Sequence, residues 1–176
     1  KLILDFDMVI WIVGLSGVGK SSTGSVLYQK IKKTNPATVL IDGDQIRDIF
    51  SQNKSNNDYS LEARRINANR IVAICEWLDR QGITVVCNIL CVFNDILRQN
   101  KLRFSKYKQI ELVAPMSCLI ERDPKGIYTS FEKGLISNVV GLDIEYEKPQ
   151  NSDLVFDTSI GKLPEEIAQE VLEHVI

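Results

Sequence analysis

The feature that most constrains this chain is a glycine-rich turn between an apolar run and a helical stretch. The run Val9–Val13 is continuously apolar, as expected for a strand that is buried on both faces. The turn that follows has the spacing Gly-x-x-x-x-Gly-Lys-Ser at residues 14–21, and residues 20–33 predict a helix that ends before Asn35-Pro36. A strand, a tight turn and a helix in this order predict the first crossover of an α/β sheet.

Short apolar runs and amphipathic stretches continue to alternate along the chain. Further strands are predicted at residues 38–41, 83–90, 109–113 and 154–156. Further helices are predicted at residues 61–80 and 94–104, and from Pro164 onward. Because helices separate the strands, the sequence predicts an α/β fold, a P-loop three-layer sandwich with a mostly parallel sheet.

A single domain is expected for residues 1–176, with two segments that stand apart. The stretch 122–150 fits neither the helical nor the strand period and contains several Gly and Pro residues. A long irregular segment inside a compact domain is usually functional, so we predict a lid here. Residues 1–7 carry two acids and no cleavage-site pattern, and we interpret them as an upstream extension.

Composition narrows the class of protein and its partners. Hydrophobic residues make up 44% of the 176 residues and charged residues 25%, and the net charge of −2 argues against nucleic acid as the main partner. The four cysteines have no C-x-x-C spacing and there is one histidine, so a zinc site is not expected. Unpaired cysteines and the absence of an apolar run of ~18 residues indicate a cytoplasmic protein with no membrane partner.

The glycine-rich turn has a direct chemical meaning. Its glycines let successive main-chain N–H groups point at phosphate oxygens, and the following helix adds the positive end of its dipole. Lys20 is expected to reach the β- and γ-phosphates of ATP, and the Ser21 hydroxyl to help hold Mg²⁺. The residues predicted to bind ATP are Gly14, Leu15, Ser16, Gly17, Val18, Gly19, Lys20, Ser21, Ser22 and Arg122.

Several classes of protein share such a loop, and the remaining sequence favours a small kinase. A GTPase needs a D-x-x-G switch followed later by an N-K-x-D motif. The chain has D-x-x-G at residues 123–126 and N-K at residues 53–54, but the second motif lacks its Asp and the order is reversed. We therefore interpret both matches as coincidence.

Two carboxylates follow the second predicted strand. Asp42 and Asp44 would lie beside the phosphate loop, at the edge where ligands bind in open α/β sheets. Either could orient an attacking hydroxyl as a base or hold Mg²⁺ through water, and either could instead serve as turn and helix-cap residue. The third strand ends without an acid, so the aspartate that many P-loop enzymes carry there is missing. Cations such as Arg47, Arg64 and Lys125 could clamp an anionic acceptor.

Four motifs together resemble the adenylylsulfate kinase family. They lie at residues 14–22, 42–47, 122–128 and 146–149, in the family's order and at its spacing. The resemblance implies transfer of the γ-phosphate of ATP to the ribose 3′-hydroxyl of adenosine 5′-phosphosulfate. It implies that Asp42, with Lys20, is catalytic, and that Asp44, Arg47, Arg64, Asn67 and Lys125 contact the acceptor nucleotide.

The departures from the family pattern fall mostly on the acceptor side. Tyr59 and Val139 stand where the family usually has two Phe residues that enclose the acceptor base, and Leu90 and Cys91 replace part of a Phe-Ile-Ser-Pro stretch. Losing one aromatic wall removes roughly 0.5–1.5 kcal/mol of stacking and reshapes the slot. With Asn138, these residues complete the predicted acceptor site.

The economical inference is the same reaction on a different small-molecule nucleotide. The chain resembles the cytidine diphosphoramidate kinase branch of the family, which acts in the decoration of bacterial capsules with phosphoramidate. Two alternatives stay open, namely an ordinary adenylylsulfate kinase of sulfate assimilation and a catalytically silent nucleotide-binding module with a regulatory role. A homodimer stays open as well.

Overall fold

The described residues form one sheet of five strands, all of them parallel. The structure is a computed structural model that describes residues 7–50 and 58–175. The sheet has the order β2-β3-β1-β4-β5. Its strands are β1 (Val9–Val13), β2 (Thr38–Asp42), β3 (Thr84–Ile89), β4 (Tyr107–Val113) and β5 (Leu154–Asp157). The sheet is thus wholly rather than mostly parallel, and each predicted strand is present within two residues of its predicted bounds.

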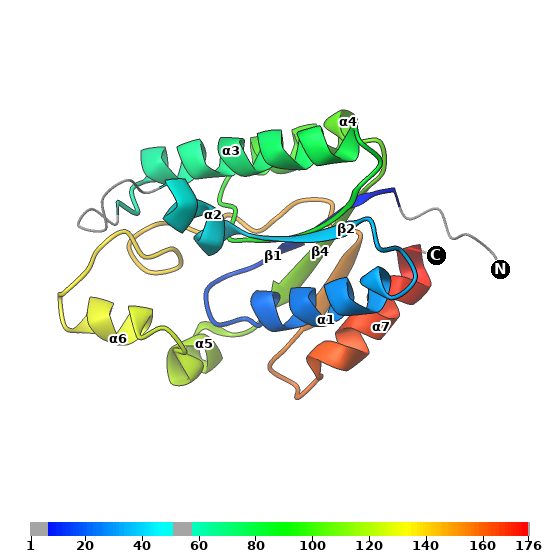
Figure 1. The fold of residues 1–176 in the computed structure, drawn as a ribbon. Helices are drawn as coiled ribbons and strands as arrows, with labels where there is room; N and C mark the ends of the chain where they lie inside the picture. Colours follow the sequence, from blue (N-terminus) through cyan, green and yellow to red (C-terminus); the bar gives the residue numbers. More distant parts are fainter. Residues whose placement is uncertain (1–6, 51–57, 176) are drawn as a thin grey trace.

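Helices cover both faces of this sheet and make the fold a three-layer sandwich (Figure 1). The helices are α1 (Lys20–Lys32), α2 (Gly43–Phe50), α3 (Leu61–Asp79), α4 (Asn94–Arg103), α5 (Met116–Arg122), α6 (Ile127–Glu132) and α7 (Pro164–Val175). In Figure 1, α3 and α4 lie above the sheet and α1 and α7 below it, while α6 lies beyond one edge of the sheet. This arrangement confirms the predicted fold class.

The central strand β1 divides the core into two halves. Ile10 and Ile12 belong to the core between the sheet and the helices α1 and α7. Val9, Trp11 and Val13 belong to the core between the sheet and the helices α3 and α4. All five side chains of β1 are fully buried, because alternate residues of a strand point to opposite faces and both faces are covered. The continuous apolar run in the sequence is explained by this position.

Three helices were not predicted. The helix α2 begins at Gly43, directly after β2, and the Asp42 carboxylate accepts a hydrogen bond from the Asp44 N–H at 3.0 Å. Asp42 therefore caps a helix, which was one of the alternatives left open for this residue by the sequence. The helices α5 and α6 have seven and six residues, which is too short for a clear helical period. The irregular stretch expected at 122–150 thus contains α6, and residues 1–6 of the expected extension lie outside the described residues.

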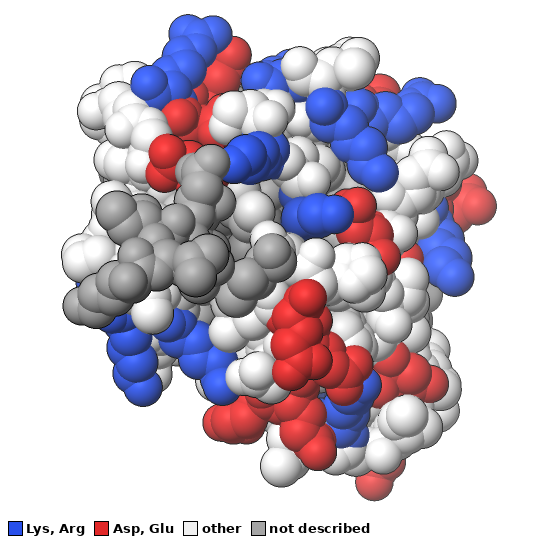
Figure 2. All heavy atoms as spheres, turned by 90° about the vertical axis from the view of Figure 1, so that its right-hand side faces the viewer, with Lys and Arg blue, Asp and Glu red and all other residues white. Residues whose placement is uncertain are grey.

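The loops that leave the carboxyl ends of the strands gather at the edge of the sheet near α2 and α6 (Figure 1). On the side of the molecule away from this edge, Lys and Arg side chains lie among Asp and Glu side chains, and several acidic side chains gather in the lower middle of the view (Figure 2). Both signs of charge share this face. Within residues 7–50 and 58–175, no helix combines the length and the hydropathy needed to cross a bilayer.

Gly14, where β1 enters the loop, offers a test of how closely the chain is packed there. Its φ is +151°, and a Cβ at this position would lie 2.5 Å from the Leu112 carbonyl oxygen and 2.9 Å from Val18 Cγ1. Strain at positive φ and overpacking together should lower the free energy of unfolding of Gly14→Ala by about 3 kcal/mol, measured by urea denaturation. Gly134→Ala is the control, because its φ is +68° with no atom within 4 Å, and it should lose only about 1 kcal/mol. Equal losses would contradict the packing argument.

Candidate active site

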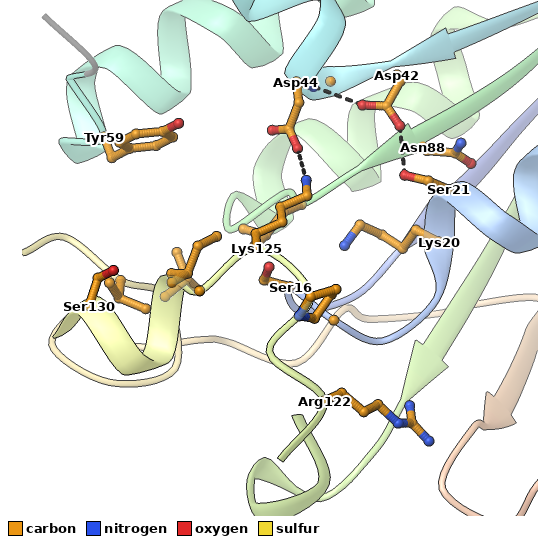
Figure 3. A pocket seen from close by; sticks show the side chains of 18 of the residues that line it. Ser16, Lys20, Ser21, Asp42, Asp44, Tyr59, Asn88, Arg122, Lys125 and Ser130 are labelled. Atoms are coloured by element: carbon orange, nitrogen blue, oxygen red, sulfur yellow. Dashed lines mark hydrogen bonds and ion pairs between the residues drawn. The ribbon is translucent and has the colours of Figure 1, made fainter. Parts of the chain in front are cut away.

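A cavity of about 690 Å³ opens at the carboxyl edge of the sheet. Its volume is in the range of small-molecule sites. The walls come from segments far apart in the sequence, namely the phosphate loop, the start of α2, the region of Tyr59 and Arg64, and residues 122–140 (Figure 3). Predicted site residues that line it are Ser16, Gly17, Gly19, Lys20, Ser21, Ser22, Asp42, Asp44, Tyr59, Arg64, Leu90, Arg122, Lys125, Asn138 and Val139.

The phosphate loop and the start of α1 together form one wall of the cavity. Gly19 precedes the helix in the left-handed conformation, with φ at 99°. The Lys20 ammonium donates a hydrogen bond to the Leu15 carbonyl oxygen at 2.7 Å, and the Tyr128 hydroxyl donates to the Ser16 carbonyl oxygen at 3.0 Å. The loop is thus held closed around its lysine and tied to α6. Lys20, Ser21 and Ser22 at the start of α1 line the cavity, so the positive end of the helix dipole lies there, and the first turn has no acidic residue to offset it.

The charges around the Lys20 ammonium only partly compensate for its burial. Burial lowers the pKa of its ammonium from 10.5 to about 8, with the charge of Lys125 acting in the same direction and Asp44 and Asp42 opposing it. A buried cation that is only partly balanced by carboxylates has a strong electrostatic attraction for an added anion. This environment suits binding of a polyphosphate.

Asp42 connects β2 to the phosphate loop. Its carboxylate accepts a hydrogen bond from the Ser21 hydroxyl at 2.8 Å, in addition to the Asp44 N–H described above. The hydroxyl at the start of α1 and the carboxylate at the end of β2 therefore lie together at the inner end of the cavity (Figure 3). The capping and functional interpretations of Asp42 are compatible, because a carboxylate has further lone pairs for a ligand.

An ion pair spans the cavity between α2 and the segment after α5. The Lys125 ammonium bonds to the Asp44 carboxylate, as the dashed line in Figure 3 shows. Burial alone would raise the pKa of Asp44, but the hydrogen bond and charge of Lys125 hold it below its usual value. Burial likewise opposes the charge of Lys125, and Asp44 raises the pKa of Lys125 in return. A ligand that binds between these two side chains must replace this contact.

Two arginines surround Tyr59. The guanidinium carbons of Arg47 and Arg64 lie 4.8 and 5.4 Å from the centre of its ring, within cation–π distance. Arg64 also donates hydrogen bonds to the carbonyl oxygens of Tyr59, at 2.8 Å, and of Asn138, at 2.9 Å. Burial and the charge of Arg47 lower the pKa of Arg64. Arg64 thus joins α3 to the segment 122–150 and adds positive charge to this wall.

Arg122 lines the cavity, but its guanidinium points away from its centre in Figure 3. Its two terminal nitrogens donate to the hydroxyl and carbonyl oxygens of Thr158, at 3.1 and 2.7 Å. These bonds fix the end of α5 to the end of β5.

Six predicted site residues do not line the cavity: Gly14, Leu15, Val18, Arg47, Asn67 and Cys91. Val18 packs in the core beneath α1. Asn67 is buried and donates to the Gly43 carbonyl oxygen at 3.1 Å, which positions the start of α2. Cys91 is also buried, and burial raises the pKa of its thiol to about 11. Asn67 and Cys91 support the cavity wall from behind.

The cavity also includes residues that the sequence did not suggest: Gly43, Asn88, Pro124, Gly126, Ile127, Ser130, Ile136, Ser137 and Val140. Most belong to the segment 122–150, whose lack of a period gave no hint of which side chains face inward. Asn88 is different, because a polar residue inside the apolar run of β3 is itself a signal.

Comparisons with known proteins identify the family to which this site belongs. A family model described as adenylylsulphate kinase matches residues 7–157. The chain belongs to the adenylylsulfate kinase family. It is 33% identical over 167 residues to a cytidine diphosphoramidate kinase from Campylobacter jejuni, covering 95% of both chains. It is 31% identical over 152 residues to a probable adenylyl-sulfate kinase from Archaeoglobus fulgidus, covering 86% of this chain and 96% of the other.

Solved structures agree with this assignment. The Mycobacterium tuberculosis APS kinase CysC, in complex with AMPPNP and APS, superposes with a TM-score of 0.83 at 25% identity, covering 94% of this chain and 95% of the other. Membership of this family makes the chain a kinase, a phosphotransferase that uses ATP as co-substrate and small-molecule nucleotides as substrates. The comparisons therefore favour an active kinase over a catalytically silent nucleotide-binding module.

The lowered pKa of Lys20 predicts a pH dependence for nucleotide binding. A phosphate binds the protonated ammonium, so ADP affinity should be nearly constant below about pH 8 and should fall above it by up to about tenfold per pH unit. Calorimetric titration of ADP between about pH 7 and pH 9.5 would measure this slope. Lys20→Arg is the matched control, because a guanidinium stays charged over the whole range. A flat profile for the wild type would contradict the assignment of Lys20 to phosphate.

Proposed function

We propose that this kinase transfers the γ-phosphate of ATP to the ribose 3′-hydroxyl of a cytidine nucleotide, cytidine diphosphoramidate. The observation that carries the proposal is the match to the Campylobacter jejuni cytidine diphosphoramidate kinase over 95% of both chains. The similarity to adenylyl-sulfate kinases at 31% identity keeps adenosine 5′-phosphosulfate as the second candidate acceptor.

The acceptor end of the cavity supports the smaller base. Val139 is 5% exposed and lines the cavity with Tyr59 and Leu90. The main-chain N–H groups of Asn138 and Val139 donate to the Asp143 carboxylate at 2.8 and 2.6 Å, which fixes this part of the wall. A branched aliphatic side chain offers packing but no aromatic stacking, so a pyrimidine held by hydrogen bonds and one aromatic ring suits this end better than a purine.

The charges are arranged for two anionic partners. Lys20 and the amides of residues 15–19 would hold the polyphosphate of ATP. Lys125 and Arg64, on the opposite walls, would hold the diphosphoryl group of the acceptor. Cations between two anionic substrates offset their repulsion and the charge that develops on the transferred group.

Asp42 is proposed to orient the acceptor 3′-hydroxyl for in-line attack. Its position at the end of β2, next to Ser21, puts a carboxylate beside the phosphate loop, and accepting the hydroxyl proton would assist the transfer. The segment 122–150 is proposed to act as the lid that excludes water, with Arg64 and Lys125 as its contacts to α3 and α2.

Magnesium is the usual companion of ATP, and the oxygen atoms at the inner end of the cavity fit it. The Ser21 hydroxyl and the Asp42 carboxylate lie 2.8 Å apart, and both are hard oxygen donors of the kind that Mg²⁺ prefers. Ser21 would hold the cation directly, and Asp42 would hold it through water. Asp44 is the second carboxylate that could hold the cation through water, once its bond to Lys125 opens. When bound, the cation would offset charge on the phosphoryl oxygens.

The acceptor is tested by comparing substrates. Steady-state ADP release should show a higher kcat/KM for cytidine diphosphoramidate than for adenosine 5′-phosphosulfate, because the pocket lacks the second aromatic wall. Mass spectrometry of the product should show one added phosphate, and phosphorus–proton coupling in its NMR spectrum should place that phosphate on the 3′-oxygen. A preference for adenosine 5′-phosphosulfate would replace the proposed function by its second candidate.

The role of Asp42 is tested with its isostere. Asp42→Asn keeps one oxygen to accept from the Asp44 N–H, and its NH2 group can donate to the Ser21 hydroxyl, so the fold should persist while the carboxylate charge is removed. We expect acceptor-dependent ADP release to fall by about 10²- to 10⁴-fold. Binding of ADP without metal is the control and should change little. Turnover equal to that of the wild type would show that Asp42 is a helix cap alone.

A further inference from the structure

Asn88 lies where the sequence lacks an expected acid. It is near the carboxyl end of β3, directly opposite Asp42 in the parallel register of β2 and β3, and it lines the cavity. Paired residues of neighbouring strands point to the same face, here the face covered by α1. Asn88 is only 2% exposed.

The carboxamide of Asn88 is buried without a hydrogen-bond partner in the described part of the chain. Neither Oδ1 nor Nδ2 has a hydrogen bond to any residue of the ranges 7–50 and 58–175. A buried amide that is left unsatisfied is unfavourable, and such groups in native proteins usually have a ligand or an ordered water. Both amide atoms lie against Gly24 of α1, while the residue itself lines the cavity, so a partner in the occupied site requires the carboxamide to turn from α1 toward the cavity.

The helix α1 makes room for this side chain. A Cβ on Gly24 would lie 2.0 Å from Asn88 Oδ1 and 2.5 Å from Nδ2, so no other residue at position 24 is compatible with the present position of the amide. Gly in the middle of a helix is unfavourable relative to Ala. The chain thus accepts two unfavourable features, an unsatisfied amide and an interior helical Gly, for one side chain, which argues that the side chain has a function.

The neighbours of Asn88 indicate that function. Gly24 lies one helical turn after Ser21 on α1, and residues three apart share a helix face. Asn88 is therefore next to both partners of the Ser21–Asp42 hydrogen bond, one through α1 and the other through the β2–β3 register. Figure 3 draws all three side chains at this end of the cavity. An amide oxygen beside a hydroxyl and a carboxylate is a suitable acceptor for water that is bound to a divalent cation.

We propose that Asn88 is a positioning residue whose carboxamide binds the hydration water of a divalent cation at the Ser21–Asp42 pair. The proposal rests on the proposed function, because it assumes that a cation accompanies the nucleotide here. Asn88 then acts as a neutral substitute for the missing strand-end acid, and the carboxylates of Asp42 and Asp44 supply the negative charge.

The probe is Mn²⁺, whose binding to the ADP-saturated protein is measured by electron paramagnetic resonance without any turnover. Outer-sphere partners of metals typically contribute about 10- to 100-fold to affinity, so Asn88→Ala should bind Mn²⁺ about 10-fold more weakly or worse. Asn88→Asp keeps an oxygen at this position and should bind Mn²⁺ at least as tightly as the wild type. Affinity for ADP without metal should stay the same in both variants.

A double variant separates binding from packing. Gly24→Ala alone should lower the thermal midpoint, because its methyl group would collide with the amide. In Gly24→Ala/Asn88→Ala the new methyl group fills the space that the amide leaves, so the thermal midpoint should recover while Mn²⁺ affinity stays weak. Asn100→Ala is the matched control, because Asn100 is a fully buried Asn on α4 that does not line the cavity, and its Nδ2 likewise has no hydrogen-bond partner among the described residues.

The outcomes distinguish this inference from the proposed function. Wild-type protein that binds Mn²⁺ with ADP, together with a double variant that binds it equally tightly, would overturn the role of Asn88 and leave the kinase proposal intact. Wild-type protein that binds ADP but no Mn²⁺ would overturn both the cation site and the role of Asn88. Weakened Mn²⁺ binding in Asn100→Ala as well would show a general packing effect and would also overturn the proposal.

Discussion

The burial of β1 on both faces is the constraint on which the rest of the structure depends. β1 is the central strand, flanked by β3 and β4, and its alternate side chains enter the two halves of the core. The phosphate loop leaves directly from this strand, and a Cβ on its first glycine would lie 2.5 Å from the Leu112 carbonyl oxygen of β4. Binding energy for a phosphate is therefore not used to order the loop, because the core has already ordered it.

The parallel register then brings chemistry from separate segments to one edge. Asp42 ends β2 and Asn88 lies opposite it on β3, while Ser21 begins α1 after the loop that follows β1. Features that depend on local sequence pattern could be predicted from the sequence, whereas contacts between distant segments could not. Apolar runs and the loop spacing predicted every strand and the position of Lys20, because each depends on local pattern. The partners of Asp44 and Arg64 could not be predicted, because Lys125 and Asn138 reach them through a segment that lacks any period.

The difference between local pattern and long-range packing also explains why two predicted acceptor residues do not line the cavity. Asn67 and Cys91 were assigned to the acceptor by resemblance, and the structure has them buried behind the wall of the cavity. A sequence motif indicates that a residue lies near a site. Only the packing of the folded chain decides whether its side chain faces the ligand or the core. The helix α2 shows the converse, because the same Asp42 carboxylate caps a helix and faces the cavity. Capping chemistry and site chemistry both favour an acid there, so the sequence alone leaves the two interpretations open.

Charge explains why an amide rather than an acid suits the end of β3. Asp42 lies opposite Asn88, and Asp44 adds a second carboxylate two residues on. A third carboxylate at position 88 would face Asp42 across adjacent strands, where like charges destabilise a sheet, and it would be almost fully buried. A neutral carboxamide avoids that repulsion in the unliganded protein and still offers an oxygen to bound water. The combination of Gly24 with Asn88 then follows as one structural unit, because the amide can occupy this position only where the facing helix has no side chain.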